Sequence, residues 1–266
     1  MSTTAAPVTI DTARPGVPLG RLVKLELRKM FDTRSGFWLM MSIAIVALIA
    51  TVSVILVQAF ADDPNVSYET FGGAVGFPMA VILPVIAILS VTSEWSQRTG
   101  LITFTLTPHR GSVILSKAIA AIIVGVVSMI VAMAIGAIGN LIGSGATGEP
   151  LVWDIGVDDF LLILFGNVLG LLIGFMLGVL VRNSAAAIVA YFVYSFVLPT
   201  IFEVLSQLMD WFSDLRPWID FNFAQGQLFD APVSGEEWAQ IGTSGIIWFV
   251  IPLLIGVRAV LRSEVK

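Results

Sequence analysis

The sequence contains no cysteine and a single histidine, His109. A disulfide, a cysteine-built metal site and a histidine-rich metal centre are therefore impossible within the chain. Charged residues are also scarce, at 12% against 57% hydrophobic residues, whereas a soluble domain usually carries about a quarter charged residues. This composition indicates a membrane protein.

The motifs of several enzyme classes are missing as well. The sequence has no GxxxxGK[ST] phosphate loop, no HExxH zinc motif and no GxSxG nucleophile turn. Ion-coupled carriers usually place carboxylates deep in their spans and show a repeat between halves, and neither feature is evident here. We therefore expect a non-enzyme with no catalytic residue, no metal and no cofactor of its own, and no nucleic-acid partner.

Six apolar stretches are long enough to cross a bilayer, because a membrane helix needs about 20 apolar residues. The expected fold class is an all-α polytopic membrane protein with six transmembrane helices. The predicted spans are residues 37–60, 71–91, 113–141, 160–181, 185–205 and 245–261.

Basic residues decide the expected orientation, since Lys and Arg remain on the cytoplasmic side of membrane proteins. With six crossings, every Lys and Arg except Arg216 falls on one side, and most acidic residues fall on the other. We expect a multi-pass protein of the plasma membrane with both termini in the cytoplasm. Lys117 and Arg182, at span ends, are expected to snorkel to the inner surface.

The chain divides into a tail, a helix and a membrane domain. Residues 1–18, rich in Thr, Pro and Ala, predict a disordered cytoplasmic tail. Residues 19–36 predict an amphipathic interfacial helix, and residues 37–266 form the transmembrane domain. Within that domain, residues 94–111 are a predicted cytoplasmic loop and residues 206–244 a predicted extracellular segment.

The interfacial helix follows a 3.6-residue pattern that gathers apolar residues on one side and basic residues on the other. Such a helix is expected to lie flat on the inner leaflet of the lipid bilayer. Leu25 and Glu26 are imperfections in the pattern. The candidate residues of this surface are Leu22, Val23, Leu27, Lys29, Met30 and Phe31.

The loop between the second and third spans combines an apolar cluster with charged flanks. Leu101, Ile102, Phe104 and Leu106 fit a strand or a short helix equally well. The cluster could fold back on the bundle or dip into the membrane interface. Alternatively, it could be buried in a groove of a partner protein, where each side chain would contribute about 1.5 to 3 kcal/mol.

Small residues and prolines mark two further features of the spans. Gly166, Gly170, Gly174 and Gly178 are spaced by four in the fourth span and predict a packing seam, either to a helix of the same chain or to a second copy. Prolines predict kinks whose freed carbonyls are satisfied by neighbours. They are Pro78, Pro84, Pro199 and Pro252.

The segments "ELRKMFDTRSGFW" and "SEWSQRTGLITFTLTPHRGSVILSKAIAA", together with the six spans, resemble the permease subunits of type-2 ATP-binding cassette (ABC) transporters, especially the small actinobacterial ones. The order Arg98-Thr99-Gly100 departs from the commoner Gly-Thr order of that family. The residues that match its loop pattern are Glu94, Trp95, Arg98, Thr99, Thr107, Pro108, Arg110 and Lys117.

The resemblance implies a coupling helix in the loop, seated in a cleft of a separate P-loop ATPase subunit. It also implies two permease copies with two ATPases, ATP and Mg bound by the ATPase, and re-entrant helices over residues 206–244 that cap the exit. The residues implied at the ATPase interface are Glu94, Trp95, Arg98, Thr99, Gly100, Leu101, Ile102, Phe104, Leu106 and Arg110.

The resulting hypothesis is a permease subunit of an ATP-driven ABC exporter that forms its path as a dimer. The expected substrate is hydrophobic or amphiphilic: a drug, a lipid or a peptide. The alternatives are an ion-coupled secondary carrier and a non-transporting scaffold or sensor subunit.

Overall fold

The computed structural model describes residues 17–96, 110–230 and 232–262. Over these ranges the chain is helical, has no β-strand and contains six segments long and apolar enough to cross a membrane. The predicted fold class, all-α with six spans, is confirmed. The segments are Gly36–Ala59, Tyr68–Ser93, Gly111–Thr147, Val157–Val181, Ser184–Leu208 and Gly235–Arg262.

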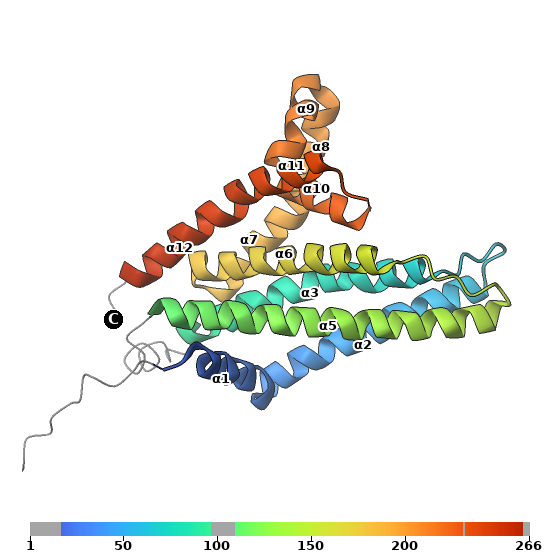
Figure 1. The fold of residues 1–266 in the computed structure, drawn as a ribbon, viewed down its shortest axis with the longest axis horizontal. Coiled ribbons are helices and arrows are strands. Elements are labelled where there is room, and N and C mark those ends of the chain that lie inside the picture. Colours follow the sequence, from blue (N-terminus) through green and yellow to red (C-terminus); the bar gives the residue numbers. More distant parts are fainter. Residues whose placement is uncertain (1–16, 97–109, 231, 263–266) are drawn as a thin grey trace, which may run out of the picture.

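The first four spans form one bundle, which is coloured from blue to yellow in Figure 1. It consists of α2 (Arg34–Ala59), α3 (Tyr68–Ser96), α5 (Arg110–Thr147) and α6 (Val157–Val181). α3 and α5 each pack against the other three helices, and the most extensive contact is between α3 and α6. The largest fully buried side chains that α3 contributes are Phe71, Val75, Met79, Leu83, Ile86 and Ile88.

The chain turns sharply between α1 (Leu19–Asp32) and α2. Thr33 caps α2 by accepting a hydrogen bond from the Gly36 amide at 3.1 Å. A Cβ atom at position 36 would overlap the carbonyl oxygen of Met30, so glycine permits the tight approach. The amphipathic helix is therefore a separate element that ends at Asp32, within the predicted range 19–36.

A hydroxyl group from another span completes the backbone of α3 at its proline. Pro84 has no N–H, so the carbonyl of Ala80, four residues earlier, loses its helical donor. Tyr191 of α7 (Ser184–Phe192) donates its hydroxyl to that carbonyl at 2.6 Å. The prediction that neighbours satisfy freed carbonyls is confirmed at this proline.

The last two spans share an interruption of their α-helices. Residues 193–199 read VYSFVLP and residues 246–252 read IIWFVIP. In each, a single five-residue π-helical turn, η1 (Val193–Val197) or η3 (Ile246–Val250), stands immediately before the proline-bearing helix. Those helices are α8 (Leu198–Leu208) and α12 (Ile251–Arg262). The wider turn and the missing proline N–H therefore interrupt regular α-helical bonding at the same place.

Short helices lie between these two spans, and we call residues 209–230 the cap. The cap contains α9 (Asp210–Ile219), α10 (Phe221–Gly226) and the 3-10 turn η2 (Gln227–Phe229). α9 lies at the top of Figure 1, at the end of the last two spans that is remote from the C-terminus.

The sixth span differs from its predicted range because it starts at Gly235 rather than at residue 245. α11 (Gly235–Gly245) runs directly into η3 and α12. Ser234 and Glu237 form a capping box, in which the Ser234 hydroxyl accepts from the Glu237 amide and the Glu237 carboxylate accepts from the Ser234 amide. This cap starts a helix in a stretch too polar to be recognised as part of a span.

Candidate functional site

A buried carboxylate fastens α1 to the bundle. Glu26 is 7% exposed, and its two oxygens accept hydrogen bonds at 2.7 Å from the ammonium groups of Lys29 and Lys117. Lys117, on α5, is 5% exposed and also donates to the Ser90 carbonyl of α3 at 3.2 Å. We call Glu26, Lys29 and Lys117 the Glu26 cluster. It joins three helices from distant parts of the sequence.

The charges of the Glu26 cluster stabilise one another. Burial alone would raise the pKa of Glu26, but the ammonium groups of Lys117 and Lys29 outweigh it and hold the pKa below the ordinary value of 4.5. The carboxylate therefore stays charged at neutral pH. Since one carboxylate pairs with both ammonium groups, a change in any of the three charges affects the other two, and the cluster behaves as a unit.

The Glu26 cluster corrects two expectations about single residues. Glu26 is not an imperfection of the amphipathic pattern, because it is the polar anchor of the face that packs on α5. The prediction that Lys117 snorkels to the surface is wrong: Lys117 is 5% exposed, and its ammonium group lies 2.7 Å from a carboxylate oxygen of Glu26, which compensates its charge inside the protein.

The other predicted residues of α1 differ in their exposure. Leu22 is buried, and Val23, Leu27 and Met30 are half-buried against the bundle. Lys29 and Phe31 are exposed. The helix therefore presents both an attached face and an exposed face with a basic and an aromatic side chain.

The predicted ATPase-interface residues lie at the ends of two bundle helices and in the segment between them. Glu94 and Trp95 belong to the last turn of α3, and Arg110 is the first residue of α5. The remaining candidates lie outside the described residues: Arg98, Thr99, Gly100, Leu101, Ile102, Phe104 and Leu106. Ser90 and Lys117 place the Glu26 cluster within two helical turns of both ends of this segment.

The four glycines of the predicted seam lie against elements of the same chain. A Cβ at Gly174 would come 2.5 Å from the Pro84 carbonyl oxygen, and one at Gly178 would come 3.3 Å from the backbone of Ile88. Gly166 and Gly170 instead approach the side chains of Phe229 and Gln225. The seam therefore has a part that packs on α3 and a part that packs on the cap region.

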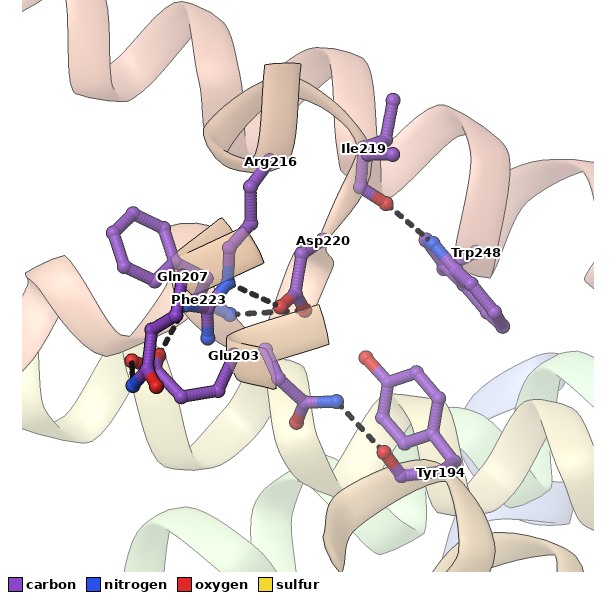
Figure 2. Close-up of polar contacts among 9 residues, drawn as sticks. Tyr194, Glu203, Gln207, Arg216, Ile219, Asp220, Phe223 and Trp248 are labelled. Atoms are coloured by element: carbon purple, nitrogen blue, oxygen red, sulfur yellow. Dashed lines mark hydrogen bonds and ion pairs between the residues drawn. The ribbon is translucent and has the colours of Figure 1, made fainter. Parts of the chain in front are cut away.

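An ion cluster organises the cap end, as Figure 2 shows. The Arg216 guanidinium pairs with Glu203 of α8 and, at 3.2 Å, with Asp220. It also lies 4.6 Å from the ring centroid of Phe223. We call Glu203, Arg216 and Asp220 the Arg216 cluster. Arg216 is the one basic residue expected on the side opposite to every other Lys and Arg. Its pairing with these two carboxylates explains why a basic residue is found there.

Two hydrogen bonds tie the cap to the interrupted spans. Trp248 of η3 donates its indole N–H to the Ile219 carbonyl at 2.6 Å, and Asn222 donates its amide to the Tyr194 carbonyl of η1 at 3.0 Å (Figure 2). The rings of Tyr194 and Trp248 lie 5.5 Å apart. The cap thus rests on both π-helical turns.

A cavity of about 230 Å³ lies between α3, α6, η1 and α10. We call it the cap cavity. None of its lining side chains is charged, and no group of three potential metal ligands exists among the residues the structure describes. Its polar lining includes Asn167, Tyr194, Asn222 and Gln225. The sequence reading missed these residues, although an asparagine such as Asn167 inside an apolar span is a recognisable signal.

Comparison with known proteins adds one match. A family model described as "ABC-2 family transporter protein" matches residues 22–198. No curated protein matches the chain. The matched range begins in α1, includes the loop between α3 and α5, and ends at the first residue of α8.

Proposed function

Because the chain belongs to the ABC-2 transporter family, we propose that it is the membrane subunit of an ATP-driven exporter. The family member with this domain is a permease component and works with an ATP-binding subunit. The finer proposal is a homodimer of this chain with two ATPase subunits, in the plasma membrane, with both termini in the cytoplasm. Its cargo is a hydrophobic or amphiphilic molecule.

The family match carries this proposal, because it includes most of the amphipathic α1 and the whole loop between α3 and α5. The restriction of every Lys and Arg except Arg216 to one side supports the orientation. A loop with four large apolar side chains needs a surface that shelters it from water. The ATPase subunit would supply that surface, and ATP and Mg would bind there.

The Glu26 cluster suggests how movement would pass into the membrane. Closure of the ATPases around ATP would displace residues 94–110. Ser90, Lys117 and Glu26 join the neighbouring parts of α3, α5 and α1, so the three helices would move together. Such rigid movement of packed helices is a common way to alternate between two arrangements.

Co-purification tests the proposal. The tagged full-length chain is extracted from its native membranes in mild detergent, and we expect a P-loop ATPase in equal amount together with ATP hydrolysis. Phe104→Asp should abolish both without affecting membrane insertion. Phe60→Asp is the matched control, because Phe60 is 86% exposed and directly follows α2, at the end of that helix remote from α1.

The opposite results would contradict the proposal. Transport by the chain alone in liposomes under an ion gradient would establish a secondary carrier. A chain that carries no ATPase and moves nothing would be a scaffold or sensor. Export is tested in inside-out vesicles, where ATP should drive substrate uptake.

A further inference from the structure

The apolar side of α1 is occupied by the bundle. Leu22 and Glu26 are buried, and Met30 packs against the core of the bundle. An amphipathic helix that lies alone on a bilayer buries its apolar side among the acyl chains. Here α5 covers that side, so a contact of α1 with the membrane involves the opposite side of the helix.

α1 lies beside the bundle and not beyond its end. Glu26, in the middle of α1, meets Lys117, which is the eighth residue of α5 and also meets Ser90 of α3. At 1.5 Å per residue, this contact lies about 10 Å inside the first residue of α5. Figure 1 shows α1 alongside that part of α5. The free side of α1 therefore faces outward, toward the surrounding leaflet, whereas a protein bound to residues 94–110 would approach the ends of α3 and α5.

Exposed aromatic side chains indicate the depth of α1 in the membrane. Phe37 and Trp38, at the start of the span that begins at Gly36, are 50% and 61% exposed. Exposed tryptophan at the end of a span is typical of the headgroup layer. Thr33 is the only residue between α1 and α2. The end of α1 that joins α2 therefore lies at the level of the lipid headgroups.

The outward side of α1 is basic. Arg21, Lys24 and Arg28 are exposed and, at intervals of three and four residues, share one side of the helix. We call these three residues the basic face. Arg28 pairs with Asp32 at 2.6 Å, but neither Arg21 nor Lys24 forms an ion pair with any residue that the structure describes. Two cations are thus left for an anion from outside the chain.

We propose that the basic face binds the phosphate groups of anionic phospholipids, with Arg21 and Lys24 as the binding residues. A basic side chain at a membrane surface favours anionic lipid roughly fivefold, whereas the choline of a zwitterionic lipid offsets its phosphate. The Glu26 cluster connects α1 to α3 and α5, so the bound lipid would hold the outer side of a helix that is joined to two spans. The proposal does not depend on the transport function.

A local fluorescence measurement tests the proposal, because the chain has no cysteine of its own. Leu25, which is 50% exposed beside Lys24, is replaced in the full-length chain by Leu25→Cys and labelled with bimane. Phosphatidylcholine nanodiscs then receive equal small fractions of 5-doxyl phosphatidylglycerol or 5-doxyl phosphatidylcholine, whose nitroxide lies just below the headgroups. We expect the phosphatidylglycerol to quench at least about fivefold more strongly, and this ratio to fall in 1 M NaCl.

Variants place the lipid at the basic face. Arg21→Gln/Lys24→Gln should bring the quenching ratio close to one, while unchanged quenching by the phosphatidylcholine probe shows that α1 keeps its depth. Arg258→Gln/Arg262→Gln is the matched control, because both arginines are exposed on α12, which lies on the far side of α5 from α1 (Figure 1). This control should keep the wild-type ratio.

Three results would overturn the proposal. The first is a wild-type ratio near one, and the second is an equal loss of the ratio in the α12 control, which would assign it to overall charge. The third is a wild-type ratio in Arg21→Gln/Lys24→Gln; if this variant also lost the ATPase in the co-purification experiment, the basic face would be a protein-binding surface. Since that experiment does not use the lipid probes, a failure here leaves the transport assignment standing.

Discussion

The Glu26 cluster and the Arg216 cluster have opposite compositions: the first pairs one carboxylate with two ammonium groups, and the second pairs one guanidinium with two carboxylates. In the Glu26 cluster, the side chains of Glu26 and Lys117 are 9% and 5% exposed. In the Arg216 cluster, the side chains of Arg216 and Asp220 are 11% and 3% exposed, but that of Glu203 is 52% exposed. The first links Glu26 to Lys117, 91 residues away, whereas the pairs of the second are 4 and 13 residues apart.

The difference shows which cluster holds the fold together. A buried pair becomes costly once one partner is lost, because the other charge is left in a poor dielectric environment. The Arg216–Glu203 pair loses little when Glu203 is replaced, since this carboxylate is half-exposed and Arg216 keeps its buried partner Asp220. We therefore expect the Glu26 cluster to fasten distant helices and the Arg216 cluster to shape the cap locally.

Removal of Lys117 gives the largest expected effect. Lys117→Met leaves Glu26 with only Lys29, whose side chain is 42% exposed, and should lower the free energy of unfolding by about 3 to 5 kcal/mol. Unfolding of the purified chain by denaturant in detergent measures it. The double variant Glu26→Met/Lys117→Met removes both buried charges of this pair and should recover most of the lost stability, and Arg28→Met serves as a surface control on α1. If Lys117→Met alone were as stable as the wild type, burial would not distinguish the two clusters.

The glycine seam extends the comparison to packing. Gly174→Ala places a methyl group 2.5 Å from the Pro84 carbonyl oxygen, and backbone cannot easily move away, so we expect a loss of about 1 to 3 kcal/mol. Gly166→Ala meets the Phe229 ring at 2.8 Å, and this exposed side chain at the cap can turn aside. In the same denaturation measurement, Gly174→Ala should have a clearly lower free energy of unfolding than Gly166→Ala. The reverse order would mean that the cap is the more rigid partner of α6.

Acid should weaken the Glu26 cluster gradually. The pKa of Glu26 is lower in the folded chain than its ordinary value of 4.5, so its contribution to stability is present above pH 4.5 and is lost as the pH falls through the folded pKa. The stability difference between the wild type and Glu26→Gln should therefore shrink on acidification. Thermal unfolding between pH 7 and pH 3 measures that difference, and a constant value would exclude Glu26 as the titrating group.

The smallest effect is expected at the exposed carboxylate of the Arg216 cluster. Glu203→Gln leaves Arg216 paired with the buried Asp220, and water hydrates the site of the lost charge. The unfolding midpoint should stay within experimental error of the wild type. A clear loss would show that the cap depends on its link to α8.

Hydropathy was sufficient to predict the six spans, because each apolar run is about as long as the bilayer core requires. Hydropathy placed the start of the sixth span too late, since the helix already begins in the polar residues that directly follow Ser234. The signal was present in another form: Ser234 followed three residues later by Glu237 is the pattern of a capping box.

The side-chain partnerships could not be predicted from periodicity. The pattern of α1 places Glu26 on its apolar face but does not identify Lys117, which is distant in sequence and meets it only after three helices have packed. Likewise, Tyr191 was not recognised as the donor for the carbonyl freed by Pro84. Such pairs depend on the relative rotation of helices, which one sequence does not determine.

α5 has 38 residues and no proline, so at 1.5 Å per residue it is roughly 57 Å long. A hydrocarbon core of about 30 Å could contain that length only at a tilt near 60°, beyond the range of about 0 to 40° seen in membrane helices. At least one end must therefore extend beyond the hydrocarbon core, where it can act as a lever arm. Each degree of rotation about one end displaces the other by about 1 Å, which turns a slight push into a displacement comparable to an atomic radius.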